Sequence, residues 1–95
     1  MSRCYVYVIS TVGGFHSKIG VSANPWARIA SLQTGSPLQL DLCHTVEMPS
    51  RAEAERVERD VHAALAEWHI HGEWFDLPDD LCIEPIEVSA ARVLQ

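Results

Sequence analysis

Residues 4–22, CYVYVISTVGGFHSKIGVS, contain two apolar runs on either side of a glycine pair, and this pattern predicts a β-hairpin. The first run is rich in β-branched and aromatic side chains, and the glycine pair suits the positive-φ positions of a hairpin turn. Alternate residues of a strand point to opposite faces. The first run therefore divides into an aliphatic face, Cys4, Val6 and Val8, and a second face, Tyr5, Tyr7 and Ile9.

The returning strand, KIGVS, divides in the same way. Its apolar side chains, Ile19 and Val21, can join the aliphatic face of the first strand. Lys18 and Gly20 are then left on the same face as Tyr7. The hairpin is therefore expected to bring a lysine and a tyrosine to one side of the sheet.

A helix and a third strand are predicted after the hairpin. Asn24 can cap the helix, Pro25 suits its first position, and Gly35 can take a left-handed closing position, so we expect a helix from Pro25 to about Gln33. Residues 37–48, PLQLDLCHTVEM, alternate as a strand with one face on a core does. The apolar residues of this strand are Leu38, Leu40, Leu42, Val46 and Met48.

A longer second helix is predicted after Ser50. Ser50 and Glu53 form a capping box, and strong helix formers without Gly or Pro continue to Trp68. The residues with the spacing of a buried stripe are Ala54, Val57, Val61, Ala64 and Leu65. Glu58 lies only about 40° from Ala54 around the helix, so it borders the core, where a carboxylate needs a partner.

The last part of the chain gives weaker signals. We expect a turn at Gly72, a short apolar run over residues 74–77, and a short helix that begins at Pro78 or Asp79. Residues 82–95 show no clear period, and covering an exposed sheet edge is one role open to them. The whole pattern predicts an α+β fold, in which a small antiparallel sheet of three strands, with room for an extra short strand, is flanked by helices.

The composition fits one compact domain over residues 1–95, because a chain of 95 residues with 47% hydrophobic residues can bury an adequate core. The cysteines, Cys4, Cys43 and Cys82, lie far apart without CxxC spacing, which indicates buried free thiols in a reducing compartment. The apolar start is too short to span a bilayer and has no secretory cleavage site. We therefore expect a cytoplasmic protein with no membrane partner.

The formal charge of −6 argues against a large electrostatic footprint on nucleic acid. Any polyanion must therefore be bound locally, and Lys18 and Arg28, two of only 7 Lys and Arg residues, bracket the turn into the first helix. Charges more than about 8 Å away are strongly screened at physiological salt. Lys18 and Arg28 could therefore hold an anion despite the acidic balance of the chain.

Four short motifs occur in a fixed order along the chain. They are YVY and KIG, which are separated by ten residues, then NPWARI, AERVERDVHAAL and GEWF. In these motifs the chain resembles the GIY-YIG nuclease superfamily, and above all its short stand-alone branch, where KIG replaces YIG and an E-x-x-x-H helix precedes GEWF. The resemblance covers residues 4–76 and implies a GIY-YIG-like fold with DNA endonuclease activity.

The resemblance also implies a role for individual residues. Tyr7 matches the tyrosine of the first motif, Lys18 stands where the second motif usually has a tyrosine, and Arg28 matches the helix arginine. Glu58 matches the carboxylate that holds a single divalent metal, Mg²⁺ or alternatively Mn²⁺. Two departures from the family pattern are Tyr5 in the position of a glycine and the lack of a matching asparagine late in the domain.

The chemistry of these residue types agrees with such roles. Phosphodiester hydrolysis needs an activated water and stabilisation of developing charge. A tyrosine with a pKa of about 10 is ionised roughly once in a thousand molecules at pH 7, but a nearby Lys18 and a metal would favour the phenolate, so Tyr7 is a candidate general base. The Arg28 fork suits phosphate oxygens, and Glu58 is a hard oxygen ligand for magnesium.

Each of these residues also has a structural alternative. Tyr7 could be an ordinary strand aromatic, Lys18 a solvated lysine at a strand end, and Arg28 could form an ion pair with Glu58. His62 is an accessory candidate that also suits a histidine at the core edge with a backbone partner.

The remaining candidates near the motifs are less defined. Tyr5 is a second accessory candidate. Trp74 and Phe75 fit a core better than a platform for bases, and Glu73 is left open between an ion pair that fixes the last strand and a supporting role at the site.

Two other functions remain open. The fold could serve as a regulatory module that binds nucleic acid or protein without catalysis, since the chain is acidic and lacks the asparagine. A zinc protein using His62, His69 and His71 is the third hypothesis, because an H-x-H pair in an extended chain points both rings one way. For the nuclease, we expect single- or double-stranded DNA as the partner, with a protein partner or a homodimer as a source of further contacts.

Overall fold

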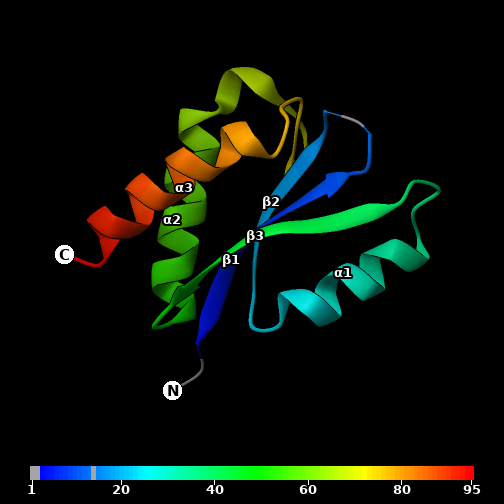
Figure 1. The fold of residues 1–95 in the computed structure, drawn as a ribbon. Coiled ribbons are helices and arrows are strands. Elements are labelled where there is room, and N and C mark those ends of the chain that lie inside the picture. Colours follow the sequence, from blue (N-terminus) through cyan, green and yellow to red (C-terminus); the bar gives the residue numbers. More distant parts are fainter. Residues whose placement is uncertain (1–2, 14) are drawn as a thin grey trace.

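The computed structural model describes residues 3–13 and 15–95 of the chain. It has an α+β fold, as predicted, with one antiparallel sheet in the order β3-β1-β2-β5-β4 (Figure 1). The strands are β1 (Cys4–Thr11), β2 (Ser17–Ser22), β3 (Leu40–Met48), β4 (His69–His71) and β5 (Trp74–Phe75). The helices are α1 (Pro25–Thr34), α2 (Arg51–Ala64), the 3₁₀ turn η1 (Ala66–Trp68) and α3 (Asp80–Val93).

The β1–β2 hairpin forms as predicted and sets the register of the sheet. Tyr7 lies opposite Gly20, and Ile9 lies opposite Lys18. Gly13 has a φ of 77°, as the hairpin turn requires, whereas the second glycine of the predicted pair, Gly14, lies outside the described residues. The two short strands β4 and β5 extend the sheet beyond the three main strands that the sequence predicts.

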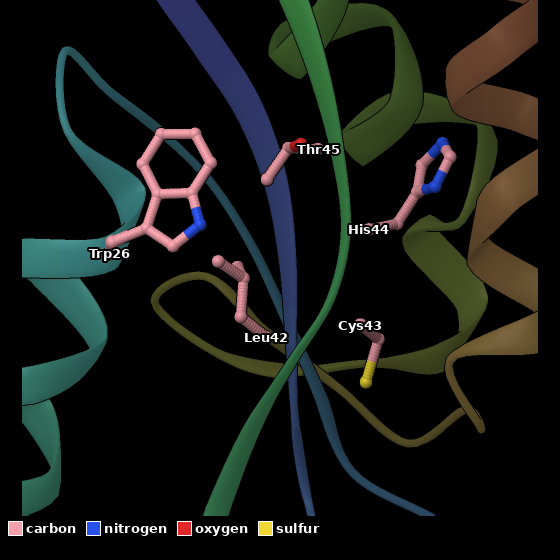
Figure 2. Close-up of a pocket in the computed structure, with 5 residues that line it drawn as sticks. All are labelled: Trp26, Leu42, Cys43, His44 and Thr45. Carbon is pink, nitrogen blue, oxygen red and sulfur yellow. The ribbon is translucent and has the colours of Figure 1, made fainter.

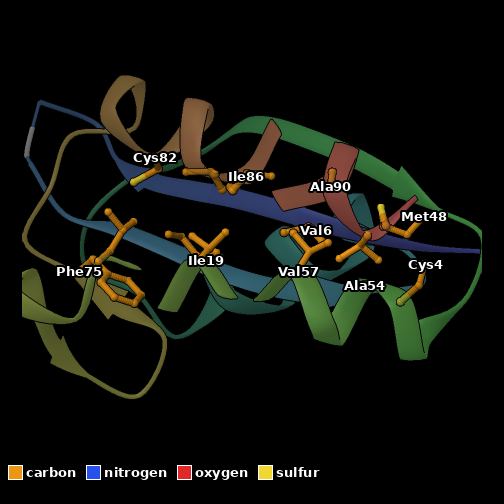
Figure 3. Packing of buried hydrophobic residues seen from close by; sticks show 14 of the residues in the cluster. Cys4, Val6, Ile19, Met48, Ala54, Val57, Phe75, Cys82, Ile86 and Ala90 are labelled. Atoms are coloured by element: carbon orange, nitrogen blue, oxygen red, sulfur yellow. The ribbon is translucent and has the colours of Figure 1, made fainter. Parts of the chain in front are cut away.

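The helices cover opposite faces of the sheet. In Figure 1, α1 lies on one side, and α2 and α3 lie together on the other. The main core fills the space between the sheet and α2 and α3, and Figure 3 shows that both helices and all three long strands contribute to it. Tyr7, Ile9 and Leu40 form a smaller cluster under α1 with Ile29 and Leu32. This division matches the two predicted faces of β1.

The prediction that β3 places all its apolar residues on one face is wrong. A bulge interrupts its pairing with β1, because Val8 pairs with His44 while Ile9 pairs with Leu42. The extra residue, Cys43, reverses the alternation, so Leu42 packs under α1 while Val46 packs against the main core. Figure 2 shows the result, with Leu42 and Cys43 on opposite sides of the strand. Leu38 precedes β3 and is exposed.

Most predicted helix signals are present. Asn24 Oδ1 accepts from the Ala27 N–H, and Ser50 Oγ accepts from the Glu53 N–H. Two details differ: Gly35 closes α1 with a φ of −95°, outside the left-handed region, and Ala64 is exposed because α2 ends there.

The C-terminal segment differs most from expectation. Instead of a short helix and an unassigned tail at a sheet edge, α3 is 14 residues long and packs over the sheet face beside α2. Pro85 lies within it, which removes one backbone donor and obscures the helical pattern in the sequence. Cys82, Ile86 and Ala90 of α3 enter the main core (Figure 3).

All three cysteines are free thiols, although Cys43 is only partly buried. Burial raises the pKa of Cys82 to about 11, so this thiol stays protonated and unreactive near neutral pH. In the described part of the chain, no helix combines the length and the apolar character needed to cross a membrane.

Candidate functional site

The candidate site begins where Tyr7 meets Gly20 across the hairpin. A Cβ atom at Gly20 would lie 2.6 Å from the Cζ of Tyr7 and 2.6 Å from Oε1 of Glu73. The tyrosine and the carboxylate therefore both lie over the backbone of residue 20. Only glycine, which has no side chain, leaves room for both groups. This close approach explains why the third residue of the KIG motif is a glycine.

Glu73 reaches this position through the β4–β5 turn. Gly72 has a φ of 54°, and the Glu73 carbonyl accepts from the Ile19 N–H at 3.0 Å, which fixes the turn to β2. The carboxylate Oε1 then pairs with Lys18 Nζ at 2.9 Å. Lys18 is only 8% exposed, and its Nζ lies 5.9 Å from the centre of the Trp74 ring. The lysine is thus a buried partner of Glu73, not a solvated strand-end residue.

Glu58 comes from α2, which lies on the face of the sheet opposite α1 (Figure 1), and its carboxyl lies close enough to Glu73 and Lys18 to be affected by their charges. One helical turn later, His62 Nε2 lies 2.9 Å from the Ile19 carbonyl. Because a carbonyl only accepts, this nitrogen carries the proton. Ile19 therefore holds Glu73 through its N–H and α2 through its carbonyl.

Glu73 lies close enough to Glu58 to affect the protonation of Glu58. Burial, followed by the charge of Glu73 and a hydrogen bond to it, raises the pKa of Glu58 to about 7, and Glu55 adds to the rise. Lys18 opposes this shift. Glu58 is therefore partly protonated near neutral pH, next to the Glu73 carboxyl group.

Arg28 approaches the same site from α1. Burial raises the pKa of Tyr7, and the charges of Glu73 and Glu58 raise it further, while a hydrogen bond from the Arg28 guanidinium and its charge lower it. The Tyr7 ring is fully buried, whereas Arg28 is exposed. The arginine is therefore the member of this group that faces solvent and can meet an incoming phosphate.

The structure thus brings together the side chains that the sequence singled out as a site, Tyr7, Lys18, Arg28 and Glu58. Glu73, which the sequence left undecided, lies at the centre and contacts or influences three of them. Its position after Gly72 in GEWF was the one available signal. The alternative ion pair between Arg28 and Glu58 is not formed among the described residues.

The two accessory candidates, Tyr5 and His62, each already have a hydrogen-bond partner. Tyr5 Oη donates to Glu47 Oε1 at 3.1 Å, and the Tyr5 ring packs edge-on against Trp26. His62 has the backbone partner that its structural alternative required, and its ring packs against Phe75. Tyr5 thus supports the sheet surface, and His62 positions α2.

The zinc hypothesis lacks support in the structure. His69 Nε2 is bound to the Gly72 carbonyl at 2.8 Å, and the strand is irregular between His69 and His71. Over residues 3–13 and 15–95, no group of three or more His, Cys, Asp or Glu side chains could hold a metal ion.

The carboxylate pair nevertheless fits a magnesium ion, which commonly takes one or two protein carboxylates and completes its shell with water and phosphate. Glu58 and Glu73 supply hard oxygen donors, and their mutual repulsion is only partly offset by Lys18. A divalent cation would relieve this repulsion. These two carboxylates could therefore hold a divalent cation, and the Mg²⁺ or Mn²⁺ site at Glu58 stays a prediction.

Two comparisons gave no match and one identified a family. A profile of the T5orf172 domain matches residues 4–91, nearly the whole chain. The search of the curated proteins and the search of the solved structures each found no match.

Proposed function

Because the chain belongs to the T5orf172 domain family, which points to a nuclease-like, DNA-binding function, we propose that it is a metal-dependent endonuclease of the GIY-YIG type that hydrolyses DNA. The observation that carries this proposal is the convergence of Tyr7, Lys18 and Glu58 on Glu73 beside the exposed Arg28. We further propose that residues 1–95 act as a single nuclease domain.

Each side chain has a defined part in this proposal. Arg28 binds and orients the scissile phosphate and stabilises its developing charge. Tyr7 takes the proton of the attacking water, so its phenol must first lose a proton, and its raised pKa opposes this loss. Lys18 holds Glu73 in place. Glu58, next to Glu73, would hold the Mg²⁺ or Mn²⁺.

When bound, the divalent cation would supply positive charge that lowers the pKa of nearby acidic groups and stabilises phosphate oxygens. The two influences that raise the Tyr7 pKa besides burial are the charges of Glu73 and Glu58. Neutralising these charges would therefore favour the phenolate. In this proposal the Tyr7 phenolate is therefore favoured by two sources of positive charge, the Arg28 guanidinium and the cation held by the carboxylates.

The proposal is tested by cleavage assays with Mg²⁺ or Mn²⁺ on single- and double-stranded DNA. Removal of one phosphate-stabilising donor should cost roughly 100- to 1000-fold in rate, so Arg28→Ala and Glu58→Gln should be nearly inactive. Arg56→Ala and Glu84→Gln alter exposed residues of α2 and α3 and are matched controls that should keep full activity. Equal cleavage by wild type and Glu58→Gln would overturn the assignment.

A catalytically degenerate module that binds nucleic acid or protein is the second candidate. The observation that favours it is the pairing of Lys18 with Glu73, which leaves Arg28 as the cation of this cluster that faces solvent. Tight binding of DNA or of a protein without cleavage at any metal or pH would establish this alternative.

DNA, single- or double-stranded, is the proposed partner of the endonuclease. The net charge of −6 leaves little attraction for the backbone beyond the site. A protein partner or a homodimer would add the missing contacts, and DNA binding that rises cooperatively with protein concentration would reveal the homodimer.

A further inference from the structure

Trp74 connects the carboxylate cluster to a second pocket. One side of the ring is near Lys18 Nζ, at 5.9 Å from the ring centre, and the indole also lines a pocket of about 330 Å³. Trp74 follows Glu73 directly in the chain, so the pocket begins one residue away from the centre of the candidate site. Phe75, by contrast, is fully buried, so only the first of the two predicted core aromatics is available to a ligand.

The walls of this pocket combine a flat aromatic surface with polar groups. Trp74, Leu40 and Ile70 form its apolar part, and its polar part consists of Thr11, His16, Ser36 and His71. Imidazoles and hydroxyls can each donate or accept hydrogen bonds. The volume lies at the lower end of the range for small-molecule sites, about 300 to 1000 Å³, which suits a flat ring system with polar edges.

One polar atom of a residue in this wall lacks a hydrogen-bond partner among residues 3–13 and 15–95. Thr11 Oγ1 is buried and makes no hydrogen bond within the described part of the chain. Such groups are uncommon in native structures and call for an explanation. The hydroxyl has almost no accessible surface, so a ligand would satisfy it by drawing the Thr11 side chain toward the pocket.

We propose that this pocket binds one unpaired nucleobase, stacked on Trp74, from the nucleotide next to the phosphate that is cut. The proposal rests on the proposed endonuclease function and names its substrate class, which is DNA with an unpaired nucleotide at the cleavage site. A base inside a duplex is stacked and paired and would first have to leave the helix to enter such a pocket. Single strands, flaps and loops present the base without that cost.

Fluorescence of Trp74 gives a test that leaves the pocket unaltered. The other two tryptophans, Trp26 and Trp68, are exposed, so Trp26→Phe/Trp68→Phe leaves Trp74 as the only tryptophan, whose emission can be excited selectively over that of tyrosine. With metal removed to prevent cleavage, a short single-stranded oligonucleotide should quench Trp74 emission, and the corresponding duplex should quench it far less. Binding of the single strand without any quenching, or equal quenching by the duplex, would overturn the proposal.

Affinity measurements on variants give a second test. Stacking of a base on an aromatic side chain corresponds to a roughly 5- to 150-fold change in affinity, so Trp74→Leu should weaken single-strand binding by that factor. Trp68→Leu, a change at an exposed tryptophan outside the pocket, should have no effect. Unchanged binding by a folded Trp74→Leu protein would contradict the proposal.

Thr11→Val separates a ligand role from a structural one. The hydroxyl has no hydrogen-bond partner in the part of the chain that the structure describes, so its loss should leave the unfolding midpoint unchanged or slightly higher, while weakening single-strand binding several-fold. A loss of stability without a loss of binding would assign Thr11 to the fold and contradict its role in the pocket.

The pocket and the nuclease function can fail separately. Cleavage of DNA with Mg²⁺ but no Trp74 quenching would overturn the proposal of a nucleobase pocket and would support the proposed endonuclease. Quenching and Trp74-dependent binding without cleavage under any condition would support the pocket and overturn the endonuclease.

Discussion

Gly20 and Tyr7 face each other across the β1–β2 ladder, and the Tyr7 ring lies where a side chain at residue 20 would be. The same space is shared with the Glu73 carboxylate. A glycine in the middle of a strand weakens the strand and is retained where another group approaches the backbone closely. At Gly20 the approaching groups are two members of the candidate site.

Gly20→Ala should therefore damage both the fold and the site. Its methyl group would overlap the buried Tyr7 ring and displace Glu73, at a cost of about 1 to 3 kcal/mol in the free energy of unfolding. Chemical denaturation and a cleavage assay would measure the two effects. Gly35→Ala is the control, because no atom there lies closer than 4.0 Å to the new methyl group and the φ of −95° suits alanine. Equal stability of the two variants would contradict the packing described at Gly20.

The stability of the protein should depend on the protonation of Glu58. Its pKa is about 7 in the folded protein and 4.5 in a model compound, so between these values the folded state binds more protons than the unfolded state. Stability should therefore fall as the pH rises from about 4.5 to about 7, by roughly 1 to 2 kcal/mol once solvent screening is allowed for.

Denaturation curves of wild type and Glu58→Gln across this pH range would check this dependence. The variant should be more stable than wild type above pH 7 and similar to it near pH 4.5, because glutamine does not ionise. The exposed Glu84→Gln serves as the control and should follow the wild-type curve. A Glu58→Gln curve parallel to wild type would show that Glu58 titrates normally.

Lys18 and Glu73 should depend on each other energetically. Glu73→Gln leaves a buried ammonium without its charged partner, which should cost roughly 1.5 to 3 kcal/mol. The double variant Lys18→Met/Glu73→Gln should recover part of this loss. A double-mutant cycle measures the interaction directly, and single effects that add to within about 0.5 kcal/mol would exclude a direct interaction.

The position of α3 can be tested at Ile86. This side chain is fully buried between α3 and the sheet, so Ile86→Ala should destabilise the protein by about 2 to 5 kcal/mol. Val88→Ala, at a 50% exposed position of the same helix, should change stability by less than about 0.5 kcal/mol. Similar losses at both positions would contradict the packing of α3 on the sheet face.

The sequence predicted the parts of the fold whose signals are local. The faces of the hairpin follow from alternation around Tyr7, and α1 and α2 follow from caps at Asn24 and Ser50. The bulge at Cys43 could not be predicted in this way, because it depends on how β3 pairs with β1 and has no local signal in the sequence of β3. The full length of α3 was likewise not predicted, because Pro85 lies inside it and proline is unusual within a helix.

The candidate site was predicted in part for a similar reason. Motif resemblance picked out Tyr7, Lys18, Arg28 and Glu58, and the structure gathers them at one place. The central role of Glu73 depends on the β4–β5 turn and on its backbone hydrogen bond to Ile19, which are tertiary contacts without a periodic signal in the sequence.

The proposal that Glu58, next to Glu73, holds a divalent cation is tested most directly by a carbon-13 NMR titration of the Glu58 carboxyl with and without Mg²⁺. We expect an apparent Glu58 pKa of about 7 without the metal and a clearly lower pKa with it, because a cation bound by Glu58 competes with its proton. A Glu58 carboxyl that titrates at its ordinary pKa and does not respond to Mg²⁺ would contradict the account.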